Sequence, residues 1–205
     1  MCQEVFQMIQ SMDVKSAELQ LALQCAPLIT GIKVSNLLMI ESEKESAVRV
    51  ILKHTGIVHY RLLSAKGKTA FLLFRRSQLE AYLARQEIVD ILRTMGYEEF
   101  SLGSILRNFQ KRYQAYMSQR MQFPHEMGLL LGYPAEDVKG FIEHKGQNFL
   151  YSGYWKVYGN VSEKKSLFQQ YEQSKEDCVQ LLAKGMNIQR ILSLYYENDT
   201  QKAVV

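Results

Sequence analysis

Cysteine is scarce in this 205-residue sequence, which has three, at positions 2, 25 and 178, and no Cys-x-x-Cys pair. An odd number of widely spaced cysteines fits reduced thiols in a cytoplasmic protein better than a disulfide framework. No apolar run approaches the roughly 20 residues of a membrane span. The first residues, from Met1 to Asp13, also lack the long apolar stretch of a signal peptide. We therefore expect a cytoplasmic protein without membrane insertion.

An excess of charge of one sign is lacking as well. The formal net charge is +4, from 25 Lys and Arg against 21 Asp and Glu, whereas a dedicated nucleic-acid binder usually has a stronger basic excess. Hydrophobic residues make up 47% of the chain, enough for a core without disulfides or a structural metal. Without an internal repeat or linker, the sequence predicts a single domain over 1–205.

Three stretches predict strands. Residues 36–41 form a short apolar run, and residues 57–64 and 68–75 flank Ala65-Lys66-Gly67, a tight turn in which glycine can adopt a positive φ. The second and third stretches therefore form an antiparallel hairpin. Together the three predict an α+β fold with a small, largely antiparallel sheet of three or four strands, covered by many helices.

Helical periodicity accounts for most of the remaining chain. In the sheet-containing half, 1–100, Pro27 and Gly31 close one helix within a turn, and another begins at Ser42 as N-cap, with Glu45 completing a capping box. Residues 77–96 predict two helices that break near Arg85. The second half, 101–198, reads as helical, with Asn187 as the N-cap of its last helix. The tail 199–205 is expected to fray.

The segment from Phe123 to Tyr158 holds two of the three prolines and the only tryptophan. Phe-Pro-His-Glu and Tyr-Pro-Ala-Glu share one pattern, in which proline suits the first helical position. Glu126 and Glu136 then fall where a carboxylate can cap a helix start. Two helix starts are the simplest interpretation of this pattern.

Residues 124–145 also have the proportions of a helix-turn-helix, in which the front of the second helix would meet DNA. That front carries Glu136 and Asp137, and two carboxylates facing a polyanion are electrostatically unfavourable. Binding to nucleic acid is therefore not expected.

Two histidines in this segment are candidates for a site. His125, in the first turn of a predicted helix, could act as a general base or bind a ligand, and His144 closes the next helix. The sequence HEMG lacks the second histidine of the HExxH zinc motif, so no metal site is predicted.

The aromatic stretch 151–158 is the second part of the candidate site. If it is extended, Tyr154, Lys156 and Tyr158 share one face, and Trp155 and Val157 share the other. The second pair would then lie in the core. The first face could stack a flat ligand on tyrosine, with Lys156 meeting an anionic group.

Cys25 with Lys33 is a further candidate, because a cation near a thiol favours the thiolate. Cys25 lies on an apolar helical stripe, however, which predicts a buried and inert side chain. An enzyme that uses His125 as base and Cys25 as thiol is thus an alternative function.

Several of these motifs together resemble a known family. They are Cys25-Ala-Pro, Phe123-Pro-His-Glu, Leu131-Gly-Tyr-Pro, Glu136-Asp-Val-Lys-Gly-Phe-Ile and Gly153-Tyr-Trp-Lys-Val-Tyr. The chain is similar to the uncharacterised family catalogued as domain of unknown function 3793, associated with anaerobic Gram-positive bacteria. The resemblance implies a bacterial cytosolic protein but no activity, cofactor or catalytic residue.

The favoured hypothesis is a binding protein for a small flat or anionic ligand, or for a protein partner. Its site would combine the His125 helix start with the Tyr154–Tyr158 segment.

Overall fold

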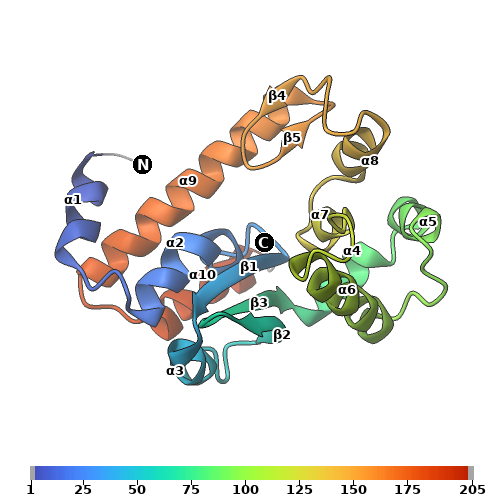
Figure 1. Cartoon of the computed structure of the whole chain (residues 1–205). Coiled ribbons are helices and arrows are strands. Elements are labelled where there is room, and N and C mark those ends of the chain that lie inside the picture. Colours follow the sequence, from blue (N-terminus) through green and yellow to red (C-terminus); the bar gives the residue numbers. More distant parts are fainter. Residues whose placement is uncertain (1–2, 203–205) are drawn as a thin grey trace. The chain divides into compact units, whose positions relative to one another are not determined.

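The computed structural model describes residues 3–202, and the chain divides into two compact units (Figure 1). Unit 1 comprises Met1–Arg75 and Gln169–Val205, and unit 2 comprises Arg76–Phe168. Helices predominate in both, and the strands form one three-stranded and one two-stranded antiparallel sheet, so the predicted α+β class is confirmed. The single domain over 1–205 stays a prediction.

Unit 1 contains the three-stranded sheet and its helices. Its elements in chain order are α1 (Gln3–Ser11), α2 (Ala17–Ile29), β1 (Ser35–Glu41), η1 (Ser42–Lys44), α3 (Glu45–Ile51), β2 (Ile57–Ala65), β3 (Lys68–Arg75), the later part of α9 (Val161–Ala183) and α10 (Ile188–Lys202). The strand order is β1-β3-β2, and both pairings are antiparallel. The predicted hairpin is confirmed: Lys66 and Gly67, both with positive φ, form the two-residue turn between β2 and β3.

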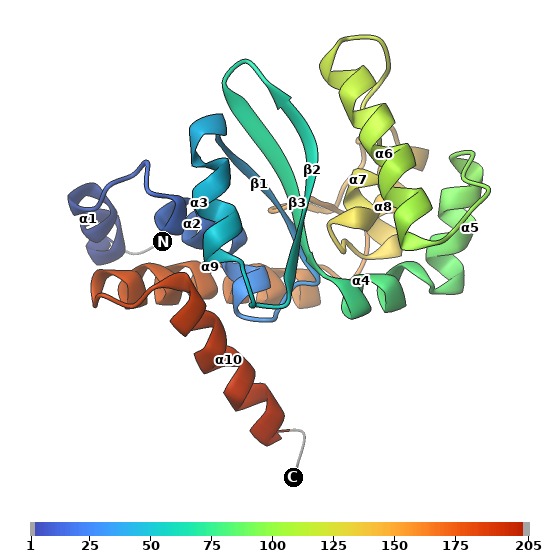
Figure 2. The ribbon, with the colours of Figure 1, turned by 90° about the horizontal axis from the view of Figure 1, so that it is seen from below.

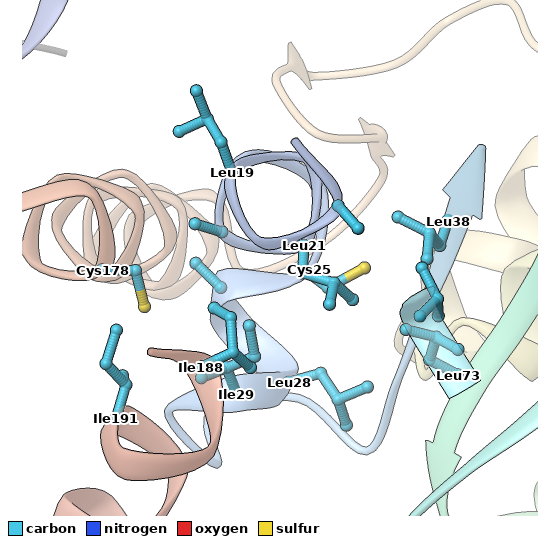
Figure 3. Close-up of a cluster of buried hydrophobic side chains, with 14 of the residues drawn as sticks. Leu19, Leu21, Cys25, Leu28, Ile29, Leu38, Leu73, Cys178, Ile188 and Ile191 are labelled. Atoms are coloured by element: carbon cyan, nitrogen blue, oxygen red, sulfur yellow. The ribbon is translucent and has the colours of Figure 1, made fainter. Parts of the chain in front are cut away.

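The core of unit 1 lies between α2, the sheet and the C-terminal helices (Figure 3). Leu38 of β1 and Leu73 of β3 meet apolar side chains of α2, and Cys178 of α9 joins the same cluster. The sequence predicted that Pro27 and Gly31 would close α2 within one turn, and α2 ends between them, at Ile29. Leu28 and Ile29 are buried in this core, and their packing outweighs the one hydrogen bond that proline removes.

The predicted capping box at the start of α3 is wrong. Residues Ser42–Lys44 form a 3₁₀ turn, and α3 begins only at Glu45. The Glu45 carboxylate accepts a hydrogen bond from Arg49 at 2.6 Å and lies 3.4 Å from the guanidinium of Arg61. The Ser42 hydroxyl lies 3.0 Å from that of Thr69 on β3. These side-chain partners replace the reciprocal cap.

Unit 2 is a group of helices (Figure 2) with a short hairpin (Figure 1). Its elements are α4 (Arg76–Leu83), α5 (Gln86–Thr94), α6 (Leu102–Met117), α7 (Met127–Leu130), α8 (Ala135–Glu143), β4 (Tyr151–Ser152), β5 (Lys156–Val157) and the first residues of α9. The break near Arg85 is confirmed, since Arg85 is the N-cap of α5. Helix α7 packs against α4 and α8.

The aromatic stretch 151–158 is a hairpin, not one extended strand. Strands β4 and β5 pair antiparallel, and the chain turns at Gly153, whose N–H donates to the Trp155 carbonyl at 3.1 Å. A side chain at Gly153 would collide with the Phe168 ring, so only glycine fits this turn. The burial expected for the two faces of 154–158 is nevertheless found: Trp155 and Val157 are buried, Tyr154 is exposed, and Lys156 and Tyr158 are half-buried.

At the C-terminal end, Asn187 caps α10 as predicted, accepting from the Arg190 N–H at 2.9 Å. Helix α10 continues to Lys202, where a frayed tail was predicted, and residues 203–205 lie outside the described part of the chain. Between residues 3 and 202, no helix combines the length and apolar character needed to cross a bilayer.

Candidate functional site

Unit 2 contains a cavity of about 320 Å³, within the lower part of the roughly 300–1,000 Å³ range of ligand pockets. Its walls come from the segment before α7, from α7 and α8, and from the β4–β5 hairpin. Most of the lining is aromatic or aliphatic: Phe123, Met127, Leu131, Val138, Phe141 and Trp155. Such a lining favours a flat or apolar group.

A stack of aromatic rings forms one wall. The Trp155 indole stacks on Tyr133, with 4.5 Å between the ring centroids and 24° between the planes. Phe168 meets the same indole edge-on, also at 4.5 Å. The Tyr82 hydroxyl donates to the Tyr133 backbone carbonyl and connects this wall to α4. Contacts on both sides of the indole fix its orientation.

The polar end of this indole is bound by Asp137, a buried residue in the first turn of α8. The Trp155 Nε1–H donates to Asp137 Oδ2 at 2.7 Å, and the Tyr158 backbone N–H donates to Oδ1 at 2.7 Å. Both carboxylate oxygens are thus engaged within the protein. Asp137 therefore positions the hairpin instead of offering a free charge to a ligand.

Lys156 is a cation of the cavity wall. Its ammonium donates to the Gly146 carbonyl at 2.5 Å and lies 4.8 Å from the Phe149 ring centroid and 5.7 Å from that of Phe141. Among the side chains described between residues 3 and 196, no carboxylate lies within ion-pair distance of this ammonium. Lys156 thus places a positive charge in the cavity wall without a direct ion pair, and the Asp137 carboxylate, which also lines the cavity, is bound by two N–H donors.

His125 lines the same cavity, next to the aromatic rings of Phe123 and Phe141 at 5.8 and 5.4 Å. Its Nδ1 atom is buried and has no hydrogen-bond partner among the described residues. An imidazole nitrogen can donate or accept, depending on its tautomer. It is therefore a polar group available to a bound molecule.

His144 and Tyr158 stack on each other beside α8, with 5.6 Å between ring centroids. A Cβ at Gly140 would lie 2.5 Å from the Tyr158 ring, so glycine at this position allows the ring to pack on the helix. Burial, with a smaller contribution from Asp137, raises the pKa of Tyr158. This pair supports α8 and the hairpin and is not part of the cavity lining.

The structure thus brings together His125, Tyr154 and Lys156 on one cavity, as the candidate site requires. The remaining two candidates, Cys25 and Lys33, belong to unit 1. Cys25 is fully buried, and burial raises the pKa of its thiol to about 12, although Lys33 opposes the shift. Cys25 is therefore a buried thiol, as its apolar stripe indicated.

Glu126 and Glu136 do not cap helices as predicted. Glu126 is buried, accepts from the Tyr97 hydroxyl at 3.1 Å and pairs with Arg112 at 3.3 Å. Glu136 pairs with Lys164 at 3.1 Å. Neither helix start has a side-chain cap, because these carboxylates meet cations from distant parts of unit 2.

The geometry of α7 and α8 does not favour the interpretation as a helix-turn-helix. Helix α7 has only four residues. In the first turn of α8, Glu136 is paired with Lys164 and Asp137 with the hairpin. The surface that would approach DNA is thus engaged within unit 2.

Sequence reasoning overlooked the role of Asp137. The only tryptophan in the chain needs an acceptor for its indole N–H when it is buried, and an acidic residue in a helix start is a suitable acceptor. That requirement was the available signal. Within the described residues, no group of three or more metal-ligating side chains lies together.

Comparison with family models gives one match: the family described as "Protein of unknown function (DUF3793)" matches residues 21–192. No curated protein and no solved structure matches the chain. The matched range includes the whole cavity, the Asp137 contacts and most of the core of unit 1.

Proposed function

Because the chain belongs to the DUF3793 family of proteins of unknown function, whose description names no activity, we propose its function from the cavity of unit 2. The protein binds a ligand that combines a flat apolar group with an anionic group. The apolar group enters between Trp155 and Phe141, and the anionic group reaches Lys156. His125 offers one further hydrogen bond.

The observation that carries this proposal is the isolated charge of Lys156. A half-buried ammonium without a carboxylate partner, set among aromatic side chains, favours an anion that would complete its hydrogen bonds. The aromatic walls add stacking and apolar contact but no charge of their own. This combination supports an acidic aromatic ligand over a neutral or cationic one.

The alternative functions are supported less well. An enzyme using Cys25 would need an accessible thiolate, and Cys25 is a buried thiol with a raised pKa. A DNA binder would need a free front on α8. The buried, unpaired cysteines Cys25 and Cys178 and the family resemblance support a bacterial cytoplasmic setting for the binding function.

The test uses two matched probes, 1-anilinonaphthalene-8-sulfonate and its neutral analogue N-phenyl-1-naphthylamine. Trp155 is the only tryptophan and lies in the cavity wall, so energy transfer from it reports binding at this site. We expect Lys156→Met to weaken sulfonate binding about tenfold or more, as one lost charged hydrogen bond implies. Binding of the neutral analogue should be unchanged.

Lys139→Met is the control, because Lys139 is an exposed lysine of α8 outside the cavity lining. It should leave the affinity of both probes unchanged. If the sulfonate and the neutral probe bind equally well, or if both lysine variants have the same effect, the proposed function is wrong.

A further inference from the structure

Apolar surface extends from the cavity onto the outside of unit 2. Phe123 and Tyr154 line the cavity yet are 40% and 37% exposed. Phe149, whose ring lies 4.8 Å from the Lys156 ammonium, is 40% exposed, and Leu150 after it is 65% exposed. Large apolar side chains that stay exposed next to a pocket typically mark a surface that a protein partner covers. We call Phe149 and Leu150 the rim.

The segment that carries the rim has charged residues of one sign. From His144 to Ser162 the sequence carries Lys145 and Lys156 but no Asp or Glu. Lys145 directly precedes Gly146, whose carbonyl accepts from Lys156. The electrostatic complement of this surface is therefore an acidic partner.

A small molecule that fills about 320 Å³ would occupy the cavity but leave the rim exposed to water. A polypeptide could fill the cavity and also cover the rim, since one side chain would enter the cavity while neighbouring residues pack on the rim. Anchoring of one large side chain in a pocket, surrounded by contacts that exclude water, is the usual construction of a binding hot spot.

We propose that the cavity and the rim together bind an acidic polypeptide segment. One aromatic or large aliphatic side chain of the segment enters the cavity, and a carboxylate one or two residues away pairs with Lys156. Its neighbouring residues pack on Phe149 and Leu150. The proposal rests on the proposed function and identifies the class of ligand.

A second copy of this chain and an anionic lipid surface fit the observations less well. Two copies joined through the rim would place the same lysines, Lys145 and Lys156, near one another, and like charges oppose such a contact. A lipid surface would attract the lysines. It would not, however, fill the aromatic cavity or meet the buried Nδ1 atom of His125. The experiment below separates these occupants.

The experiment selects a phage-displayed library of random seven-residue peptides on the full-length protein, with counter-selection against Lys156→Met. Enriched peptides are then measured by fluorescence anisotropy. We expect them to share a large apolar residue with Asp or Glu within two positions. Replacing that acid by its amide should remove the difference in affinity between the wild type and Lys156→Met.

The variant Leu150→Ser separates this proposal from the proposed function. It should weaken peptide binding about tenfold through lost apolar contact, and leave 1-anilinonaphthalene-8-sulfonate binding unchanged. Val50→Ser, at an exposed apolar position of α3 in unit 1, is the control and should change neither affinity.

If no peptide is enriched, or if enriched peptides bind Leu150→Ser and wild type equally, the polypeptide ligand is wrong and the small-ligand function stands. If the sulfonate probe is also independent of Lys156, both proposals fail. Concentration-dependent dimerisation, or sedimentation with phosphatidylglycerol vesicles, that Leu150→Ser abolishes would assign the rim to a second copy or to lipid and overturn the proposal.

Discussion

The indole N–H of Trp155 donates to the carboxylate of Asp137 at 2.7 Å, and both side chains are buried. The same carboxylate accepts the backbone N–H of Tyr158 at 2.7 Å. These two donors lie immediately before and after β5, whose first residue is Lys156. A single carboxylate at the start of α8 thus holds both ends of the short strand that presents the cavity cation.

Asp137→Asn should lower the free energy of unfolding by about 2–4 kcal/mol. The NH2 group of asparagine would replace a carboxylate oxygen that accepts a hydrogen bond, and would face an N–H donor. Trp155 and Tyr158 both donate, and asparagine has only one oxygen. Urea unfolding followed by Trp155 fluorescence measures the change. Glu143→Gln, at an exposed position of α8, should stay within about 0.5 kcal/mol of wild type. Equal effects of the two variants would contradict the role of Asp137.

Gly140→Ala should destabilise the protein by about 1–3 kcal/mol through overpacking. The added methyl group would lie 2.5 Å from the Tyr158 ring and would push it from α8. Gly103→Ala is the matched control, since its nearest neighbour is the flexible Arg107 side chain at 3.4 Å. Helix propensity predicts that this control is neutral or gains up to about 1 kcal/mol. Thermal unfolding of both variants tests the difference. If Gly140→Ala is as stable as the wild type, the Tyr158 ring does not pack closely on Gly140.

Local signals in the sequence were enough to predict much of the fold. Gly67 with its two flanking apolar runs specified the β2–β3 hairpin, and Asn187 specified the start of α10. Both signals are local, since Gly67 acts through its own positive φ and Asn187 through a hydrogen bond three residues away. The helix break at Arg85 is of the same kind. His125 and Lys156 were predicted to share a site, and both line the cavity.

Features that depend on distant partners could not be predicted. Asp137 binds Trp155, 18 positions later, and Glu126 binds Tyr97, 29 positions earlier. A local cap was predicted for Glu126 and no partner was predicted for Asp137, whereas tertiary packing provides a donor for each. The hairpin at Gly153 escaped prediction for the same reason, because the ring of Phe168 on α9 occupies the space that a side chain would need.

The buried carboxylate of Glu126 leads to a third prediction. Arg112→Met should lower the free energy of unfolding by about 2–3 kcal/mol, because it leaves a buried carboxylate without its cation. Arg112 also donates to the Met95 carbonyl at 2.6 Å. Lys111→Met, at the neighbouring exposed position, should have little effect.

Combining Arg112→Met with Glu126→Gln should recover part of the lost stability, because the unpaired charge is removed. Urea unfolding of the two single variants and the double variant gives the coupling energy between the residues. Purely additive effects would show that the ion pair at 3.3 Å does not couple them.

The last prediction concerns Lys33 in unit 1, where burial lowers the pKa of the ammonium from 10.5 to about 8. Between these two pH values the unfolded chain holds a proton that the folded chain has released, so this residue makes stability rise with pH. Below pH 8 both states are protonated and the full penalty of burial remains. The free energy of unfolding of the Lys33 protein, relative to Lys33→Met, should therefore increase from pH 8 to pH 10.5.

Both proteins should carry Cys25→Ala, because the Cys25 thiol interacts electrostatically with Lys33 and would otherwise titrate differently in the two. Tyrosine titration is common to both proteins and cancels in the difference. Lys53→Met, at an exposed position, is the control for replacing a lysine by methionine. A flat difference would mean that folding does not shift the pKa of Lys33, and a falling one that its ammonium is stabilised in the folded state; either would contradict control by burial.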